Sequence, residues 1–374
     1  LKKLKILKCA KNKKISDVNH LADVLEELDC SSDSYCGYCS GIDQNGISDL
    51  KKLKILKCSG NTKISDVNHL FNILEKLSCS NNSGIDQNGI SKLKKLKILK
   101  CHDNEKINDV NHLTNTLEKL YCRYECGIDQ EGISKLRILK KLDCLGNERI
   151  NNVSHLRNML EELDCGYTYL HGVDQNGISG LKKLKILNCN NNNKINSVNH
   201  LANTLEYLYC SRNCRINQNG IMDLKKLKTL ECNGNDQIQD VNHLKNTLEK
   251  LYCSDHSEIN QNGISGLKKL RILVCDNNKN IQNVDHLANT IEQLSCSYGS
   301  GINQNGIMNL KKLKILKCND NDQIKDVNHL KNTLEHLECY GCSGISQSGI
   351  SELKKLKIIN HSGNDKIIDT SCTI

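Results

Sequence analysis

The segment Leu53-Lys54-Ile55-Leu56-Lys57-Cys58-Ser59-Gly60-Asn61 is followed by a second version of itself, Leu74-Glu75-Lys76-Leu77-Ser78-Cys79-Ser80-Asn81-Asn82. Both share the pattern L-x-x-L-x-C-x-x-N. Its cysteine recurs at positions 9, 30, 58, 79, 101, 122, 144, 165, 189, 210, 232, 253, 275, 296, 318 and 339, and a seventeenth copy carries His361 instead. Successive copies lie 21 or 22 residues apart, except at two longer steps that indicate loop insertions near 34–39 and 167–171.

This pattern predicts one short β-strand in each copy. A repeat of 21 or 22 residues is too short for a pair of helices, and Leu56, Lys57 and Cys58 alternate inward and outward as a half-buried strand does. A single coil cannot bury its apolar side, so neighbouring coils must stack leucine on leucine and cysteine on cysteine. Only 3% of the residues are aromatic and Trp is absent, which suits a thin aliphatic core. We therefore expect an elongated, curved α/β solenoid of about 17 coils over residues 1–374.

The pattern resembles the leucine-rich repeat signature L-x-x-L-x-L-x-x-N/C-x-L. The return segment Ile64-Ser65-Asp66-Val67-Asn68-His69-Leu70 also resembles that of internalin-type repeats, with His where that family has Pro. The Lys, Asn and Ile usage and the core Cys are similar to leucine-rich repeat proteins of giant viruses of amoebae. The resemblance implies a horseshoe with a parallel β-sheet on its concave face and short helical or irregular convex segments. Because the chain begins inside a repeat without Met, we expect a cap or further domain to precede it.

The true unit of the repeat is a pair of coils. Four residues before the core cysteine, odd coils carry a cation and even coils a glutamate throughout, as in Lys54, Glu75 and Lys97. Stacking in register would place each charge beside opposite charges about 5 Å away. Exposed ion pairs stabilise by only about 0–1 kcal/mol each, so we expect this charge ladder to specify register more than to add stability.

Two further positions follow the same double repeat. Every odd coil has Asn three residues after its core position, where a buried amide can satisfy backbone groups of the turn; these are Asn12, Asn61, Asn104, Asn147, Asn192, Asn235, Asn278, Asn321 and Asn364. Between even and odd coils, a Gln-Asn-Gly-Ile type of segment recurs, as at Gln44–Ile47. We expect its glycine to supply a positive φ for the return turn.

The sequence has 22 cysteines, of which sixteen occupy the inward strand position and are expected to be buried thiols that pack as small hydrophobes. The six others are Cys36, Cys39, Cys126, Cys214, Cys342 and Cys372. Cys36 and Cys39 form a C-x-x-C pair, but a structural zinc site normally needs four ligands, and no second such pair follows. They are therefore either loop cysteines without a special role or the ligands of a metal ion; we favour the first alternative and expect no metal or other cofactor.

The histidines and the motif search give no catalytic site. Eight histidines recur once per double coil, each before Leu, at His20, His69, His112, His155, His200, His243, His286 and His329. Two strand steps separate neighbours by about 10 Å, too far for shared metal ligation, so we expect polar turn residues on the convex side. The sequence contains no recognisable catalytic triad, phosphate loop or zinc-protease motif. It thus predicts a protein that is not an enzyme.

The lysine pairs of the odd coils allow a second function. Lysine pairs such as Lys51-Lys52 and Lys94-Lys95 begin the odd coils and would stack into a basic flank. This flank indicates either a solubilising surface or an anion or nucleic-acid site; the absence of interleaved aromatic platforms makes nucleic acid the weaker interpretation.

Neither a membrane-spanning run nor a secretory leader is recognisable. We expect a soluble monomer in the reducing cytoplasm, or in the host cytoplasm if the protein is viral.

The outward strand positions break the repeat, and we expect them to bind a protein partner. Just before the core cysteine the residues vary among Lys, Asp, Tyr, Asn, Glu, Ser and Val, while the scaffold stays regular. Tyr and Arg are frequent in binding hot spots. The predicted protein-binding residues are Lys100, Tyr121, Arg123, Asp143, Asp164, Asn188, Tyr207, Tyr209, Glu231, Tyr252 and Tyr340.

Overall fold

The computed structural model describes residues 3–32, 39–168 and 170–368, in two compact units, Leu1–Asn188 and Cys189–Ile374. In each unit every coil contributes one strand of three residues. The first unit contains β1 (Ile6–Lys8), β2 (Glu27–Asp29), β3 (Ile55–Lys57), β4 (Lys76–Ser78), β5 (Ile98–Lys100), β6 (Lys119–Tyr121), β7 (Lys141–Asp143), β8 (Glu162–Asp164) and β9 (Ile186–Asn188). The second contains β10 (Tyr207–Tyr209), β11 (Thr229–Glu231), β12 (Lys250–Tyr252), β13 (Ile272–Val274), β14 (Gln293–Ser295), β15 (Ile315–Lys317), β16 (His336–Glu338) and β17 (Ile358–Asn360).

Within each unit, consecutive strands pair in parallel and in the register that the repeat predicts. Leu56 of β3 lies opposite Leu77 of β4, and Leu230 of β11 opposite Leu251 of β12. From β2 to β16 the middle residue of each strand is buried, and the first and third point outward, as in β5 and β13. These outward residues form the surface that we call the strand face.

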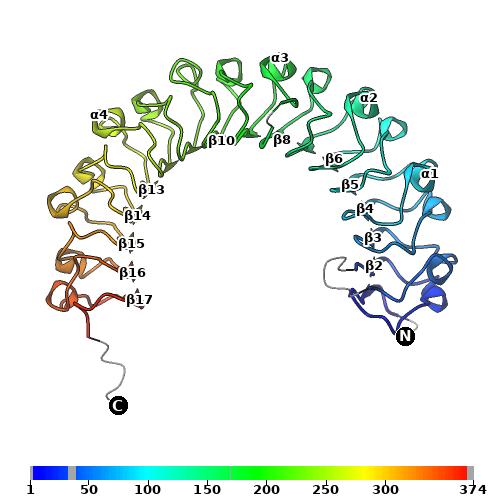
Figure 1. Cartoon of the computed structure of the whole chain (residues 1–374), viewed down its shortest axis with the longest axis horizontal. Helices are drawn as coiled ribbons and strands as arrows, with labels where there is room; N and C mark the ends of the chain where they lie inside the picture. The colour runs from blue at the N-terminus through cyan, green and yellow to red at the C-terminus, as the bar shows by residue number, and fades with distance from the viewer. Residues whose placement is uncertain (1–2, 33–38, 169, 369–374) are drawn as a thin grey trace. The chain divides into compact units, whose positions relative to one another are not determined.

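Short helices occupy the other side of most coils, the helix side (Figure 1). Four are α-helical: α1 (Gln87–Ile90), α2 (Gln130–Ile133), α3 (Gln175–Ile178) and α4 (Gln261–Ile264). The others are 3₁₀ turns: η1 (Asn19–Leu21), η2 (Asn45–Ile47), η3 (Asn68–Leu70), η4 (Asn111–Leu113), η5 (Ser154–Leu156), η6 (Asn199–Leu201), η7 (Asn242–Leu244), η8 (Asp285–Leu287), η9 (Gln304–Gly306), η10 (Asn328–Leu330) and η11 (Ser348–Ile350). The prediction of strands on one side and short helical segments on the other is confirmed.

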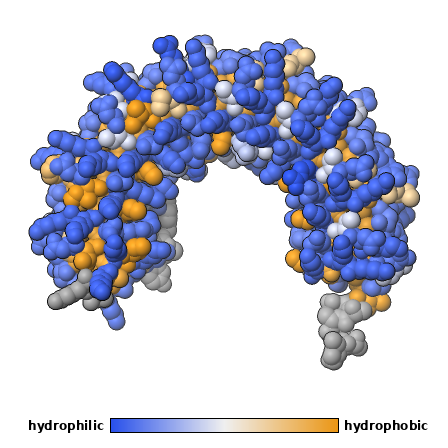
Figure 2. Space-filling model, turned by 180° about the vertical axis from the view of Figure 1, so that it is seen from behind, coloured by the Kyte–Doolittle hydropathy of each residue, from blue (hydrophilic) through white to orange (hydrophobic). Residues whose placement is uncertain are grey.

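The core between these two sides is thin and aliphatic. In the third coil, Leu56, Cys58, Ile64, Val67 and Leu70 are all fully buried. The other ladder cysteines of the described residues are buried as well, and the structure gives them as thiols rather than disulfides. Hydrophobic residues reach the surface only as separate patches among hydrophilic ones on the face that Figure 2 shows.

The predicted asparagine ladder is present. The Asn61 amide donates to the carbonyl oxygens of Cys30 (3.2 Å) and Ile42 (3.0 Å) in the preceding coil, and its oxygen accepts from the Lys63 amide at 3.0 Å. The same set of bonds recurs at Asn104, Asn147, Asn235, Asn278, Asn321 and Asn364. One buried side chain therefore satisfies three backbone groups and ties two coils together.

The charge ladder also forms. The Glu26 carboxylate accepts from Lys5 and from Lys54, both at 2.8 Å, and these bonds lower the pKa of Glu26 to about 2. Glu292 likewise lies between Arg271 and Lys314. Pairs with one contact each occur at Lys97 and Glu75, Lys140 and Glu118, Lys185 and Glu161, Lys228 and Glu206, and Lys357 and Glu335.

The prediction for the recurring glycine was wrong. Gly89 in α1 does not have a positive φ; the left-handed residues are instead those two positions after the core cysteine, such as Gly60 at 68° and Asp103 at 50°. Gly89 is required because the preceding coil passes close to it: an added Cβ would lie 2.0 Å from the Ser65 carbonyl oxygen. The Gly89 carbonyl accepts from the Val67 amide at 3.0 Å, which holds the two segments in contact.

We expect Gly89→Ala to destabilise the protein by about 2 kcal/mol or more, because the new methyl group must push the backbone of Ser65 away. Gly180→Ala is the matched control, since its Cβ would meet Ser154 at an ordinary 3.5 Å. Urea unfolding followed by circular dichroism measures both. Equal stability losses in the two variants would show that close packing does not explain the glycine.

Candidate functional site

The strand face of the first unit carries a cluster of charged and aromatic side chains on β5 to β8. Tyr121 on β6 lies between two lysines, with Lys100 Nζ 4.9 Å and Lys141 Nζ 5.6 Å from the ring centroid. The His102 ring meets Tyr121 edge to face, with centroids 6.1 Å apart. Burial and the neighbouring Lys76 charge lower the pKa of Lys100. The phenol is thus held by cations on both sides while remaining partly exposed.

Arg123, two residues after β6, is fixed by a carboxylate beneath it. Its Nε donates to both oxygens of Asp143, at 2.7 and 2.8 Å, and its Nη2 lies 2.6 Å from Asp143 Oδ2. The Asp143 side chain is only 3% exposed, whereas that of Arg123 is 37% exposed. We predicted that Asp143 would contact a partner directly, but its burial makes it the residue that positions Arg123.

Asp164 lies one strand further on, opposite Asp143 in the β7–β8 register. Burial, together with the Asp143 charge, raises the pKa of Asp164 to about 6. Arg123 Nη2 is 3.9 Å away, and Asn188 lies opposite Asp164 at the end of β9. The structure therefore brings five of the predicted binding residues, Lys100, Tyr121, Arg123, Asp143 and Asp164, into one cluster.

Sequence reasoning missed His102 and Lys141 in this cluster. His102 accepts a hydrogen bond from the Arg123 amide through Nδ1, at 3.1 Å, and burial lowers its pKa, so the ring is held neutral. Lys141 also pairs with Glu162 at 2.5 Å. The available signal was that Lys141 stands at the first strand position, where most odd coils have Ile.

The second unit has its own aromatic row on β10 to β12. Tyr209, Glu231 and Tyr252 lie opposite one another in register, and Tyr207 shares β10. Burial, followed by the Glu231 charge, raises the pKa values of Tyr209 and Tyr252. Ser211 Oγ donates to Glu231 at 3.2 Å. The phenols of Tyr209 and Tyr252 therefore stay neutral on either side of the Glu231 carboxylate, which Ser211 holds in place.

Tyr340 does not join this row. It follows β16, four strands after β12, and its hydroxyl forms a hydrogen bond with that of Tyr298, which the sequence analysis did not select. Tyr298 is half exposed and lies at the left-handed position two residues after Cys296. Tyr340 and Tyr298 thus form a separate pair in the second unit.

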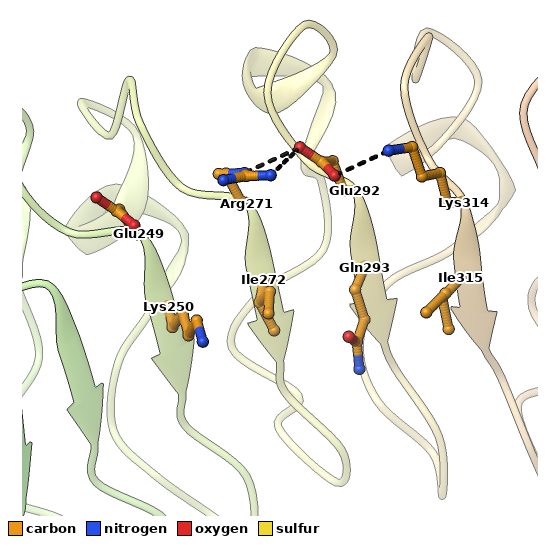
Figure 3. A pocket seen from close by; sticks show the side chains of 8 residues that line it. All are labelled: Glu249, Lys250, Arg271, Ile272, Glu292, Gln293, Lys314 and Ile315. Atoms are coloured by element: carbon orange, nitrogen blue, oxygen red, sulfur yellow. Dashed lines mark hydrogen bonds and ion pairs between the residues drawn. The ribbon is translucent and has the colours of Figure 1, made fainter.

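A shallow pocket of about 290 Å³ lies beside these rows, over β12 to β15 (Figure 3). Glu249, Arg271, Glu292 and Lys314 line one end, and Lys250, Ile272, Gln293 and Ile315 line the other. The cations at its rim are already paired, because Glu292 lies 2.7 Å from Arg271 and 3.2 Å from Lys314. The pocket therefore combines paired charges at one end with two isoleucines, Lys250 and Gln293 at the other.

Some outward residues serve the scaffold rather than a partner. The side chain directly after a core cysteine accepts a hydrogen bond from the equivalent backbone amide of the next coil, as Ser80 Oγ does from His102 at 3.1 Å. The accepting side chains are Ser59, Ser80 and His102 in the first unit, where the series ends at the Arg123 amide, and Asn190, Ser211, Asn233, Ser254, Asp276, Ser297 and Asn319 in the second, where it ends at the Tyr340 amide. A polar residue is therefore needed at this position to accept a hydrogen bond from the backbone amide of the next coil.

Of the two cysteines that form the C-x-x-C pair, the structure describes only Cys39. Cys39 is an exposed thiol, while Cys36 lies outside the described residues, as does Cys372. Within residues 3–32, 39–168 and 170–368, no group of three or more His, Cys, Asp or Glu side chains is placed to hold a metal ion. In the same ranges no helix is long and apolar enough to span a bilayer.

Known proteins share this architecture. A family model described as leucine-rich repeats, two copies, matches residues 159–203. The functional domain of InlJ from Listeria monocytogenes, which includes a cysteine ladder, superposes with a TM-score of 0.56 at 22% identity, over 94% of this chain and 70% of that one. The fold is that of the leucine-rich repeat proteins.

Two other solved structures agree with this assignment. A leucine-rich repeat protein of Leptospira interrogans gives a TM-score of 0.54 at 20% identity, covering 91% of this chain and 84% of that one. A TLR13–ssRNA13 complex gives 0.59 at 19% identity, covering 96% of this chain and 58% of that one. The search of curated proteins found no match.

The repeated histidines of the leucine-rich repeat coils lie on the helix side, as expected, but they also bind the backbone. His155 Nε2 donates to the Ile133 carbonyl of the preceding coil at 3.1 Å. His112, His243, His286 and His329 make the equivalent bond at 3.0 to 3.1 Å. Burial lowers the pKa of each of these five residues.

These histidines predict a loss of stability in weak acid. A histidine whose folded pKa is below its ordinary value of 6.5 stabilises fully above that value and progressively less as the pH falls below it. The midpoint of thermal unfolding should therefore decrease between pH 7.5 and 5.5. Asp164, with its raised pKa, acts in the opposite direction, so Asp164→Asn should make the decrease steeper. A midpoint that rises on acidification would contradict this account.

Asp143→Asn tests whether the carboxylate under Arg123 is structural. The variant keeps the shape but loses the charge-assisted bonds, and we expect it to cost about 1–3 kcal/mol. Glu162→Gln, which removes the ion pair of a carboxylate that is 38% exposed, should cost less than about 1 kcal/mol. Denaturant unfolding gives both values, and equal effects would remove the distinction between the two carboxylates.

Proposed function

We propose that this leucine-rich repeat protein is a non-catalytic scaffold that binds another protein through its strand face. The observation that carries the proposal is the Tyr121 and Arg123 cluster. Both side chains are partly exposed, and both are held in place by their neighbours before any partner arrives. Preorganised aromatic and arginine side chains lose little conformational entropy on binding, which is why they dominate hot spots.

The cluster also suggests what the partner offers. Lys100 and Lys141 flank the ring, and the exposed edge of the Arg123 guanidinium adds a third cation. A partner with an apolar or aromatic side chain for Tyr121, bordered by carboxylates for the cations, would complement this arrangement. The row of Tyr207, Tyr209, Glu231 and Tyr252 would provide a second contact region, and Tyr340 with Tyr298 a third.

The proposal includes the setting of the protein. Buried ladder thiols persist in a reducing compartment, so we propose a cytoplasmic protein, and we propose that it acts as a monomer. Asn188 is assigned to the edge of the first contact region because it lies in register with Asp164. Asp143 is assigned a positioning role.

A second candidate is anion or nucleic-acid binding through the lysine flank. The lysine pairs at 51–52, 94–95, 182–183, 225–226, 268–269, 311–312 and 354–355 are all exposed. One structure with a similar fold is a complex with single-stranded RNA by its title. Binding of this kind would depend on phosphate contacts and would weaken by orders of magnitude between low and moderate salt.

The test begins with partners captured from a lysate of the source organism and continues with affinities of the purified partner. Tyr121→Ala should weaken binding roughly 30-fold or more, as a hot-spot loss of about 2 kcal/mol does. Phe71→Ala is the matched control, because Phe71 is an exposed aromatic residue on the helix side. We expect the control to bind like the wild type, after circular dichroism has shown both variants to be folded.

Salt separates the two candidates. Binding through the Tyr121 cluster should persist at moderate salt and survive Lys225→Gln/Lys226→Gln. Capture of nucleic acid that disappears in moderate salt and in that double variant, with Tyr121→Ala unaffected, would overturn the proposal in favour of the lysine flank.

A further inference from the structure

Even coils contain a second buried position that faces the cysteine ladder. The residue four places after the ladder cysteine is buried and is Ser83, Cys126, Cys214, Ser257, Ser300 or Ser343. At Ser257, Ser300 and Ser343 the hydroxyl meets the ladder thiol of the preceding coil: Cys232 Sγ lies 4.0 Å from Ser257 Oγ, Cys275 Sγ lies 3.9 Å from Ser300 Oγ, and Cys318 Sγ lies 4.0 Å from Ser343 Oγ. The position thus directs a side chain at a specific sulfur atom.

In two coils cysteine replaces this serine, and two thiols meet. Cys101 Sγ lies 3.5 Å from Cys126 Sγ in the first unit, and Cys189 Sγ lies 3.7 Å from Cys214 Sγ in the second. All four side chains are buried. These distances are close to van der Waals contact between sulfur atoms, so a shift of less than 2 Å would bring each pair to the disulfide bond length of about 2.05 Å.

The two members of each pair differ in reactivity. A hydrogen bond from the Cys101 thiol lowers the pKa of Cys126, and a bond from Cys189 lowers that of Cys214. Ladder cysteines show the reverse, because burial raises the pKa of Cys232 to about 12, for example. The thiolate is the form that reacts with oxidants, so Cys126 and Cys214 are the nucleophilic members.

The reactive members lie close to the surface. Cys126 follows Tyr124 and Glu125, which are both exposed, and Cys214 is itself 4% exposed. Tyr124 and Arg212, each two residues before the reactive cysteine, adopt left-handed φ values of 53° and 60°. A turn of two or three residues is therefore all that separates each sulfur from solvent, and local opening of such turns admits small oxidants.

We propose that each pair is a site of reversible thiol oxidation by hydrogen peroxide. The Cys126 thiolate attacks one peroxide oxygen, the O–O bond breaks, and the departing hydroxide takes a proton to form water, leaving a sulfenic acid. The Cys101 sulfur then attacks the Cys126 sulfur, the S–O bond breaks, and the leaving hydroxide takes the Cys101 proton to form a second water. Two thiols and one peroxide give one disulfide and two waters.

The first bond would form directly under the candidate binding cluster. Cys101 stands between Lys100 and His102 at the end of β5, and Cys126 follows Arg123 by three residues. Closing the pair would tie the end of β5 to the turn after β6. The proposal does not depend on the partner, because the readout is the covalent bond itself.

Mass spectrometry of oxidised protein tests the proposal directly. We would replace the exposed Cys39 and Cys342, together with Cys36 and Cys372, by serine, treat the folded protein with peroxide, alkylate the remaining thiols in denaturant and digest with trypsin. Cleavage after lysine and arginine separates these cysteines from their ladder neighbours. We expect linked peptides 101–106 with 124–135 and 186–194 with 213–215, and reduction by dithiothreitol should release both pairs.

Matched variants control the assignment. Cys126→Ser restores the residue found in the equivalent position of four other coils, so it should fold and lose the first link while keeping the second. Ser257→Cys should add one more pair that resists alkylation after oxidation. Links scattered among ladder cysteines, or absence of both expected links in folded protein after peroxide treatment, would overturn the proposal.

Discussion

Stacking in register is the constraint on which every other feature of this protein depends, and the buried asparagine amide is its firmest point. A strand of three residues makes too few backbone bonds to define its own position against the next strand. Asn61 adds bonds to two carbonyl groups of the preceding coil and accepts one from its own turn. An amide placed one residue away would leave all of these buried groups unpaired. Once the register is fixed, leucines, cysteines and charges must line up.

The register explains how much of the fold is readable from the sequence. The strands, the aliphatic core, the asparagine ladder and the alternation of Lys and Glu follow from spacing alone, because each depends on one residue type recurring at one position. The role of Gly89 was not readable in this way. A side chain at Gly89 would collide with Ser65 of the preceding coil. A recurring glycine looks the same in the sequence whether it permits such a close approach or a positive φ.

The candidate site was predictable in position but not in the roles of its residues. Spacing places Tyr121 and Asp143 on adjacent strands and Arg123 just after the first of them, yet the burial of Asp143 follows from the path of the Arg123 side chain across it. The sequence analysis did not select His102, because this position holds serine in other coils, where the side chain only accepts a backbone hydrogen bond. His102 accepts that bond and also contacts Tyr121. The thiol pairs escaped notice because Cys126 and Cys214 vary at a position where serine is the rule, and only the folded structure shows which ladder sulfur they face.

The double repeat has a consequence for how such a chain can change its length. Duplication of a single coil would set Lys against Lys or Glu against Glu, and duplication of an even coil would also leave its carbonyl groups without the asparagine of the next odd coil. Duplication or loss of two coils preserves every contact at the new junction. Recombination between copies is therefore tolerated only in steps of about 43 residues, and the strand face must gain or lose its outward positions two strands at a time.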